Sequence, residues 1–343
     1  MRILLAVSTL VLAALLAGFV LFLFAGSAED GDIGPEKSDI AAVKTEFAFT
    51  SSEECRECHP DYYDEWSNSW HKKAWTDPTV RASWACYRDQ DCKTCHLPEP
   101  LMANGKFPQL IPRDDTDIES GINCLTCHIS PQGVLGPVGR EIEMADHCNP
   151  VYHEQIATDQ QCWQCHPNQY DDWKTSSYFG KEGCKDCHME EVERPLVPNG
   201  PVRKTRVHFW KGSHIITFIK TAYEYLVEPN GDGVKVTVAN TDSGHFFPGE
   251  RHNRALWVEV TFLDENKQQV GEMEKWVIRE GSNLPRNIAT MEIKADGKVE
   301  KTFPYPIEKG YVKTVLKFDF FYSQEDEHTR VLEDPKPIPF EKK

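Results

Sequence analysis

Five segments of the chain share one short motif, two cysteines separated by two residues with a histidine directly after the second cysteine. Two thiols at this spacing can add across the two vinyl groups of one haem, and the adjacent histidine can then bind the iron. A zinc site or a redox dithiol would not require a histidine after every cysteine pair. We therefore expect five covalently bound haem c groups. The cofactor-binding cysteines and iron-binding histidines are Cys55, Cys58 and His59; Cys92, Cys95 and His96; Cys124, Cys127 and His128; Cys162, Cys165 and His166; and Cys184, Cys187 and His188.

Each haem iron has a second axial position, which another histidine can fill. The part of the chain that holds the motifs has five more histidines, which by number alone suffices for two histidines on every iron. A lone histidine is also common as an ordinary surface or core residue, so the match can be accidental. Of the later histidines, only His245 is considered as a ligand. The five candidate metal ligands are His71, His147, His153, His208 and His214.

An internal repeat bears on these ligands. Residues 55–69 align with residues 162–176, each copy having a proline after the motif histidine and then a tyrosine, a tryptophan and a serine. The first copy continues to His71, whereas the second has Tyr178 at that position. One haem then either takes its ligand from elsewhere or keeps an open position, and an open position is what a haem enzyme requires.

The cysteines divide the chain into two parts. All 12 lie between Cys55 and Cys187, and none occurs in the last 156 residues. Ten belong to the motifs, which leaves Cys86 and Cys148 as either a disulfide or two buried thiols. No catalytic residue is predicted.

The N-terminus begins with an apolar run of 22 residues, Ile3–Phe24, followed by the small residues Gly26, Ser27 and Ala28. The run is long enough to span a bilayer, and the small residues are typical of a cleaved signal, so both readings stay open. Either one places residues 29–343 outside the cytoplasm, in the periplasm or an equivalent compartment. We expect residues 1–28 to be a signal or membrane anchor and residues 29–52 to be a tether.

The two parts of the chain predict different folds. Five motifs within residues 53–215 leave too little chain for a side-chain core, so we expect short helices and loops around stacked haems. Residues 216–343 show alternating apolar stretches at 234–238, 256–262 and 315–320, with turn residues between them. This pattern predicts an antiparallel β-sandwich.

The net charge is −16, from 54 acidic and 38 basic residues. This charge argues against non-specific nucleic-acid binding, which needs clustered basic residues. An acidic surface suits docking to a basic redox partner, although it is also what solvation of an extracytoplasmic protein requires.

The sequence resembles the multihaem cytochromes c typified by the tetrahaem electron acceptor of hydroxylamine oxidoreductase. The likeness covers about residues 50–215. It is carried by the first motif with its continuation to His71, by Gly121–His128, and by Gly183–Met189 with Val207–Gly212. The resemblance implies that His71 and His147 are distal ligands. A fifth motif and the appended β-domain depart from the tetrahaem pattern.

These observations favour an electron carrier over an enzyme. We expect a pentahaem c-type cytochrome with mostly two histidines per iron, exchanging electrons with redox proteins such as a membrane quinol-oxidising complex or another cytochrome. A reductase or oxidase of a small nitrogen or sulfur compound at one open haem is the alternative. A third reading is a subunit of a larger membrane complex or a cytochrome polymer, and the oligomeric state stays open.

Overall fold

The computed structural model describes residues 49–82, 91–102, 110–114, 116–138, 150–249, 254–279, 292–319 and 328–342. These residues belong to one compact unit, Thr45–Lys343. The predictions made for the Ile3–Phe24 run and for Cys86, His147 and Cys148 fall outside the described residues. None of the helices within the described ranges is long and apolar enough to cross a membrane. Residues 49–215 are called the haem-motif region below, and residues 216–342 the β-region.

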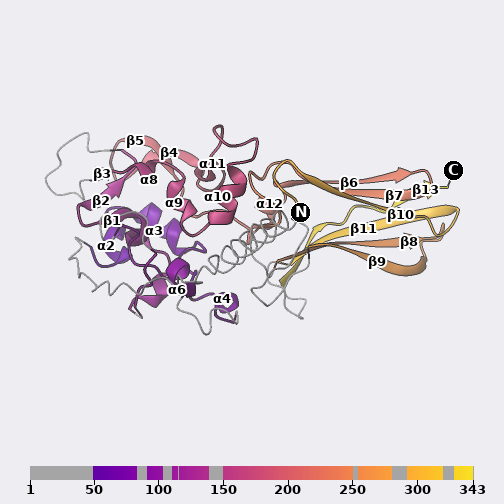
Figure 1. The fold of residues 1–343 in the computed structure, drawn as a ribbon, viewed down its shortest axis with the longest axis horizontal. Helices are drawn as coiled ribbons and strands as arrows, with labels where there is room; N and C mark the ends of the chain where they lie inside the picture. The colour runs from indigo at the N-terminus through magenta and orange to yellow at the C-terminus, as the bar shows by residue number, and fades with distance from the viewer. Residues whose placement is uncertain are drawn as a thin grey trace, which may run out of the picture. The chain divides into compact units, whose positions relative to one another are not determined.

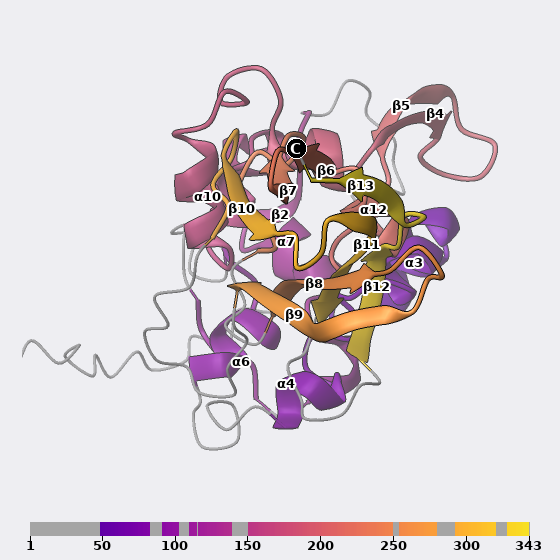
Figure 2. The same cartoon turned by 90° about the vertical axis from the view of Figure 1, so that its right-hand side faces the viewer.

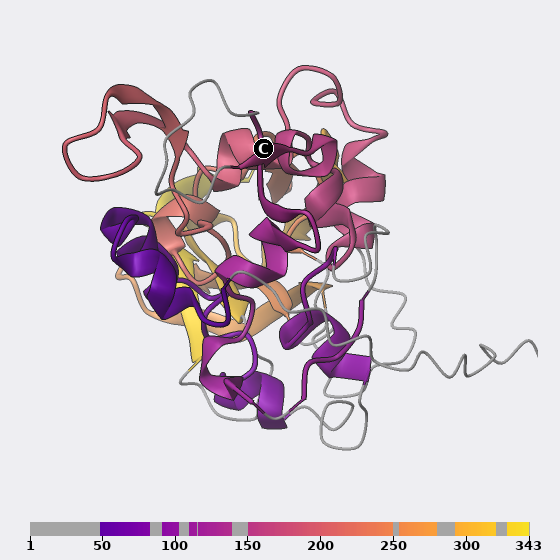
Figure 3. The same ribbon diagram turned by 90° about the vertical axis from the view of Figure 1, so that its left-hand side faces the viewer.

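The haem-motif region consists of short helices joined by long loops (Figures 1 and 3). The longest has eight residues, fewer than the roughly 12–15 that an isolated helix needs in water. Contacts outside each helix must therefore hold it. In chain order the helices are α2 (Ser52–Arg56), α3 (Pro60–Ser67), α4 (Pro78–Ala82), α6 (Asp91–His96), the 3-10 helix η1 (Ile118–Ser120), α7 (Cys124–His128), α8 (Glu154–Ala157), α9 (Gln160–Trp163), α10 (Pro167–Trp173) and α11 (Cys184–His188).

Each motif folds around a single helical turn. Helices α7 and α11 begin at the first cysteine of a motif and end at its histidine, and α6 ends at the histidine of the second motif. The side chain of Asn123 caps α7 by accepting the backbone N–H of Thr126 at 2.9 Å. The turn brings the two cysteines and the histidine of a motif to one side of the chain.

The internal repeat is also a structural repeat. In both copies the motif histidine is the N-cap of the next helix, with φ −125° and ψ 55° at His59 and φ −127° and ψ 51° at His166. Pro60 and Pro167 then open α3 and α10. Proline suits the first helical position because the N–H it lacks would have no partner there. The same residues thus direct the chain in the same way twice.

Two small sheets complete the haem-motif region. The first has the strand order β1 (Ile129–Ser130), β2 (Gly133–Gly136) and β3 (Val151–Tyr152). The second is an antiparallel hairpin of β4 (Glu191–Pro195) and β5 (Val202–Arg206).

The β-region begins with helix α12 (Ile216–Ile219) and continues as two antiparallel sheets (Figures 1 and 2). One sheet has the order β10–β7–β6 and the other the order β12–β11–β8–β9, with β13 pairing with the remaining part of β11. The antiparallel β-structure predicted here is confirmed. The strands are β6 (Tyr223–Asn230), β7 (Gly233–Asn240), β8 (Ala255–Leu263), β9 (Gln269–Arg279), β10 (Lys298–Pro304), β11 (Lys309–Asp319), β12 (Thr329–Glu333) and β13 (Ile338–Glu341).

The two sheets share one apolar core. On β8 every second residue from Leu256 to Phe262 points into it, and Val234, Val236 and Val238 do so on β7. Twenty buried residues form this cluster, whereas the apolar cluster found among the described residues of the haem-motif region has only Met102, Leu135 and Ile156. The difference fits the expectation that bound haems supply the apolar core of the first region.

The core of the β-region predicts the effect of one substitution. Phe303 on β10 is fully buried between the sheets, so Phe303→Ala should lower the free energy of unfolding by about 3–5 kcal/mol. The β-sheet signal in far-UV circular dichroism during denaturation measures this loss. Val331→Ala on β12, where half of the side chain is exposed, is the matched control and should change stability by less than about 0.5 kcal/mol. Equal losses in the two variants would contradict this description of the core.

Candidate haem-binding site

The histidines of four motifs are oriented in the same way. In each, the ring nitrogen Nδ1 lies within hydrogen-bond distance of a backbone carbonyl oxygen. A carbonyl oxygen only accepts, so Nδ1 carries the proton and Nε2 keeps its lone pair. Metal-binding histidines adopt this arrangement because the second hydrogen bond fixes the ring. The contacts are His59 to Leu196 at 2.9 Å, His96 to Ala74 at 2.8 Å, His128 to Leu135 at 2.9 Å and His188 to Lys211 at 2.5 Å.

Three motif histidines face a second histidine from a distant part of the chain. The distances between ring centres fall between 6.2 and 6.4 Å in all three pairs. A metal ion held between two imidazoles requires a separation of about 6 Å, because each metal–nitrogen bond is about 2.0–2.1 Å long. The pairs are His166 with His71 at 6.4 Å, His128 with His208 at 6.2 Å and His188 with His245 at 6.2 Å.

These imidazoles are neutral at neutral pH. Burial lowers the pKa of His71, His208 and His245 to about 4 and also lowers the pKa of His128 and His188. The same rings are nonetheless only half-buried by accessible surface. A lowered pKa and a partly accessible ring are compatible if the ring lies among protein atoms but borders a space inside the molecule. The ligands of a bound group have such an environment. The paired histidines therefore fit a haem, whose iron binds neutral imidazole.

The predicted distal histidines have different environments. His71 and His208 each face a motif histidine. His214 stacks on Trp70 with ring centres 3.5 Å apart. His153 is the N-cap of α8, and its buried Nδ1 has no hydrogen-bond partner within the described residues. The ligand roles of His147, His153 and His214 thus stay predictions.

His245, the one later histidine considered as a ligand from the sequence, is not among the five predicted candidates. The sequence offered one signal for it, its position before Phe246 and Phe247 in a loop otherwise made of small and polar residues. Its pairing with His188 depends on contacts between the two regions, which no local pattern contains.

Three pairs of motifs lie next to each other through their cysteines. The thiols of Cys55 and Cys124 are within hydrogen-bond distance, as are those of Cys95 and Cys165 and those of Cys162 and Cys184. Asp159 approaches the last pair, and its carboxylate and both sulfurs lie within 4.8 Å of one another. Both cysteines belong to haem motifs, so the cluster shows that the fourth and fifth motifs are neighbours. It does not indicate a separate metal site.

Cys92 is disulfide-bonded. A sulfur atom in a disulfide cannot also form a thioether. The disulfide and the thioether predicted at Cys92 therefore exclude each other.

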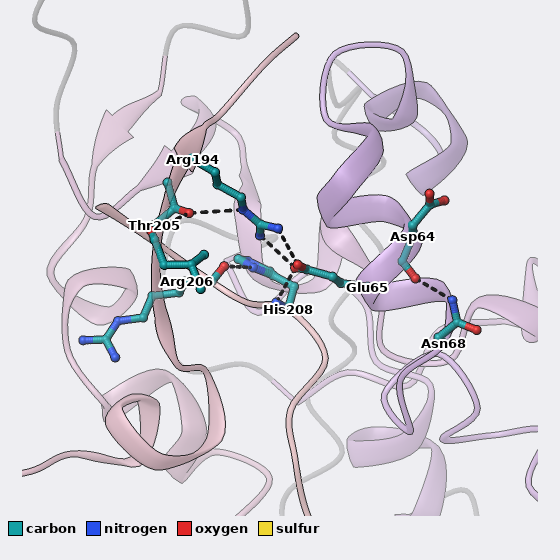
Figure 4. A network of polar contacts seen from close by, with 8 residues as sticks. Asp64, Glu65, Asn68, Arg194, Thr205, Arg206 and His208 are labelled. Carbon is teal, nitrogen blue, oxygen red and sulfur yellow. Dashed lines mark hydrogen bonds and ion pairs between the residues drawn. The ribbon is translucent and has the colours of Figure 1, made fainter. Parts of the chain in front are cut away.

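A half-buried ion pair positions His208 (Figure 4). Glu65 on α3 accepts two hydrogen bonds from Arg194 on β4, one of them at 2.9 Å, and a third from the backbone N–H of His208 at 2.8 Å. The Nδ1 of His208 also donates to the Arg206 carbonyl at 2.8 Å. Burial raises the pKa of Glu65, but these hydrogen bonds outweigh it and hold the pKa below its ordinary value. Helix α3 and the β4–β5 hairpin thus set the position of His208 together.

Residues 54–129, which include the first three motifs, match the family model described as cytochrome c554 and c-prime. The resemblance predicted from the motifs is thereby confirmed. No protein of curated function matches the chain significantly.

The fold is similar to that of a penta-heme cytochrome c552 from Thermochromatium tepidum. The crystal structure of that protein aligns with a TM-score of 0.62 and 15% sequence identity, over 84% of this chain and 99% of that chain. An alignment of this extent includes part of the β-region as well as the haem-motif region. A hypothetical protein from Pyrococcus horikoshii aligns over 33% of this chain and 86% of that chain at 19% identity, with a TM-score of 0.18.

The motifs, the family and the fold agree on one class of protein. The chain is a multihaem c-type cytochrome. Cytochromes of this class are extracytoplasmic, which agrees with the compartment predicted for residues 29–343.

The ion pair at Glu65 gives a prediction for ligand positioning. Glu65→Gln should lower the free energy of unfolding by about 1.5–3 kcal/mol, because it removes charged hydrogen bonds at side chains only 18–21% exposed. It should also give a partial high-spin signal in the electron paramagnetic resonance (EPR) spectrum as His208 is released. Glu191→Gln on the same hairpin is the control, since its ion pair with Lys204 is solvent-exposed and should contribute little to stability. A Glu65→Gln protein with wild-type stability and spectrum would contradict the positioning role.

The same residue gives a prediction for pH. The pKa of Glu65 is lower in the folded protein than its unfolded value of about 4.3, so its contribution to stability is present above that pH. The stability difference between wild type and Glu65→Gln should be constant at neutral pH and should shrink as the pH falls through the folded pKa. A difference that stays unchanged down to pH ~2 would show that the carboxylate charge is not responsible.

Proposed function

We propose that this protein is an extracytoplasmic pentahaem cytochrome that carries electrons between redox partners. The observation that carries the proposal is the set of three histidine pairs with ring centres 6.2–6.4 Å apart. When two imidazoles occupy both axial positions of an iron, a substrate has no site to bind. The site then suits electron transfer better than catalysis.

The contribution of the chain is to hold, orient and bury the cofactors. Haem supplies reversible one-electron chemistry when bound. The motif cysteines would provide the thioethers, and the hydrogen bonds from Nδ1 to backbone carbonyls keep the imidazoles in the ligating tautomer. Two histidine ligands keep the reduction potential below that of a haem with a methionine ligand.

Adjacent motifs support a route for electrons through the region. The thiol contacts place the first motif beside the third, the second beside the fourth and the fourth beside the fifth. The carbonyl of Cys127 also accepts a hydrogen bond from Gln161 at 3.4 Å, which links the third motif to the helix of the fourth. Haems attached to these motifs would form one connected series with the fourth as its branch point.

The partners follow from charge and compartment. An acidic protein with a net charge of −16 favours a basic docking surface on its redox partner, either a membrane quinol-oxidising complex or another cytochrome. Anchoring by the Ile3–Phe24 run would keep it at the membrane. A role as a subunit of a larger complex or polymer is compatible with the same chemistry.

An enzyme with one open haem is the second candidate, and His59 is the observation in its favour. Within the described residues its ring contact is with Tyr62, at 6.0 Å and nearly perpendicular, and not with a second histidine. Tyr178, which replaces His71 in the repeat, instead donates its hydroxyl hydrogen to the carbonyl of Thr241 at 2.9 Å. An open position would therefore belong to the first motif.

The two candidates differ in the EPR spectrum of the oxidised protein. The carrier should contain only low-spin haem, because every iron has two strong axial ligands. A high-spin signal that shifts on adding nitrite or hydroxylamine would replace the carrier with the enzyme.

The haem count is a separate prediction. The intact mass of the mature protein should show five haems. The Cys92→Ala variant should retain five haems with one held by a single thioether, which is detected as a haem-bearing peptide around Cys95. A wild-type mass with four haems would contradict the predicted count.

A further inference from the structure

A loop of the β-region brings His245 to the last motif. The loop follows β7, and within it the ring of His245 lies parallel to that of His188, with an interplanar angle of 10° and centres 6.2 Å apart. Nδ1 of His188 donates to the Lys211 carbonyl at 2.5 Å, and Nδ1 of His245 donates to the Phe246 carbonyl at 3.1 Å. Among the contacts of the described residues, neither Nε2 has a hydrogen-bond partner. Both rings therefore have a free lone pair.

The β-region fixes the backbone at His245. The carbonyl of His245 accepts hydrogen bonds from the side-chain amide of Asn240 at 2.8 Å and from the hydroxyl of Ser243 at 2.9 Å. The next two residues are buried, and Phe247 pairs with Ile293 through two backbone hydrogen bonds. The position of this imidazole is thus determined by the core of the β-region.

The same loop is closely packed against the haem-motif region. A Cβ atom added at Gly244 would lie 3.3 Å from Cδ1 of Trp173 and 3.4 Å from Cβ of Tyr178, so glycine permits the close approach. Tyr178 also donates to Thr241 of the loop at 2.9 Å. Nearby, Ser177 donates two hydrogen bonds to the carboxylate of Asp296 in the β-region at 3.0 and 3.1 Å. These contacts between the two regions hold the ring of His245 in place opposite that of His188.

We propose that His245 is the sixth ligand of the haem bound by Cys184, Cys187 and His188, so that the β-region completes the fifth haem site. The inference rests on the proposed function, since it requires a haem at that motif. The β-region then supplies an axial ligand to one of the haems that carry electrons. Displacing the loop would convert the fifth haem from six-coordinate to five-coordinate.

The full-length protein with His245→Gly tests the proposal. All five haems should stay attached by intact mass, since the thioethers are unchanged, while one haem in five becomes high-spin in the EPR spectrum. Adding free imidazole should restore the low-spin signal, because the glycine leaves room for an external ligand. His328→Gly, which removes another histidine of the β-region, is the control and should keep the wild-type spectrum. A His245→Gly protein with five low-spin haems and no response to imidazole would overturn the proposal.

A second variant tests the proposal if the His245→Gly protein does not fold or cannot be produced. His245→Met should keep one haem six-coordinate and raise the reduction potential of that haem alone, because a methionine ligand raises the potential relative to histidine. An unchanged set of five potentials would overturn the proposal. Failure of the proposed function is distinguishable, since it appears in the wild-type protein as a high-spin haem or a missing haem before any substitution.

Discussion

Two imidazole rings that share a metal ion must stay about 6 Å apart, centre to centre, and this requirement governs how the haem-motif region is built. In each of the three pairs one ring belongs to the histidine of a motif and the other comes from a distant segment of the chain. A short helix alone therefore cannot set the distance between the two rings. The separation depends instead on backbone carbonyls that fix the rings and on contacts such as that of Glu65 with Arg194 and the His208 N–H. Under the proposed function, a haem held by one of these pairs links two distant segments of the chain.

The same requirement explains the contrast between the two regions. The β-region has twenty buried apolar residues in one core, whereas the cluster in the haem-motif region has three. Large planar cofactors can bury the surface that side chains do not, which allows helices of four to eight residues to persist. His245 lies at the contact between the two regions. Its backbone is held by the β-region, and its ring faces the motif histidine His188.

The sequence predicted most of what depends on local pattern. The motif spacing, the repeat and the alternation of Val234, Val236 and Val238 are encoded within a few residues, and the structure has the corresponding turns and strands. His71 is a candidate ligand from the sequence because it follows its own repeat unit closely. The role of Tyr178 as a contact to Thr241 and the pairing of His245 with His188 were not predictable, since both depend on packing between segments far apart in the chain.

The central claim is that the paired imidazoles hold iron between them. A crystal structure of the mature protein with anomalous diffraction at the iron absorption edge measures this directly. We expect an iron atom between His188 and His245, about 2.0 Å from each Nε2, and equivalent atoms between the other two pairs. An iron bound by His188 alone, with His245 turned away from it, would contradict the account.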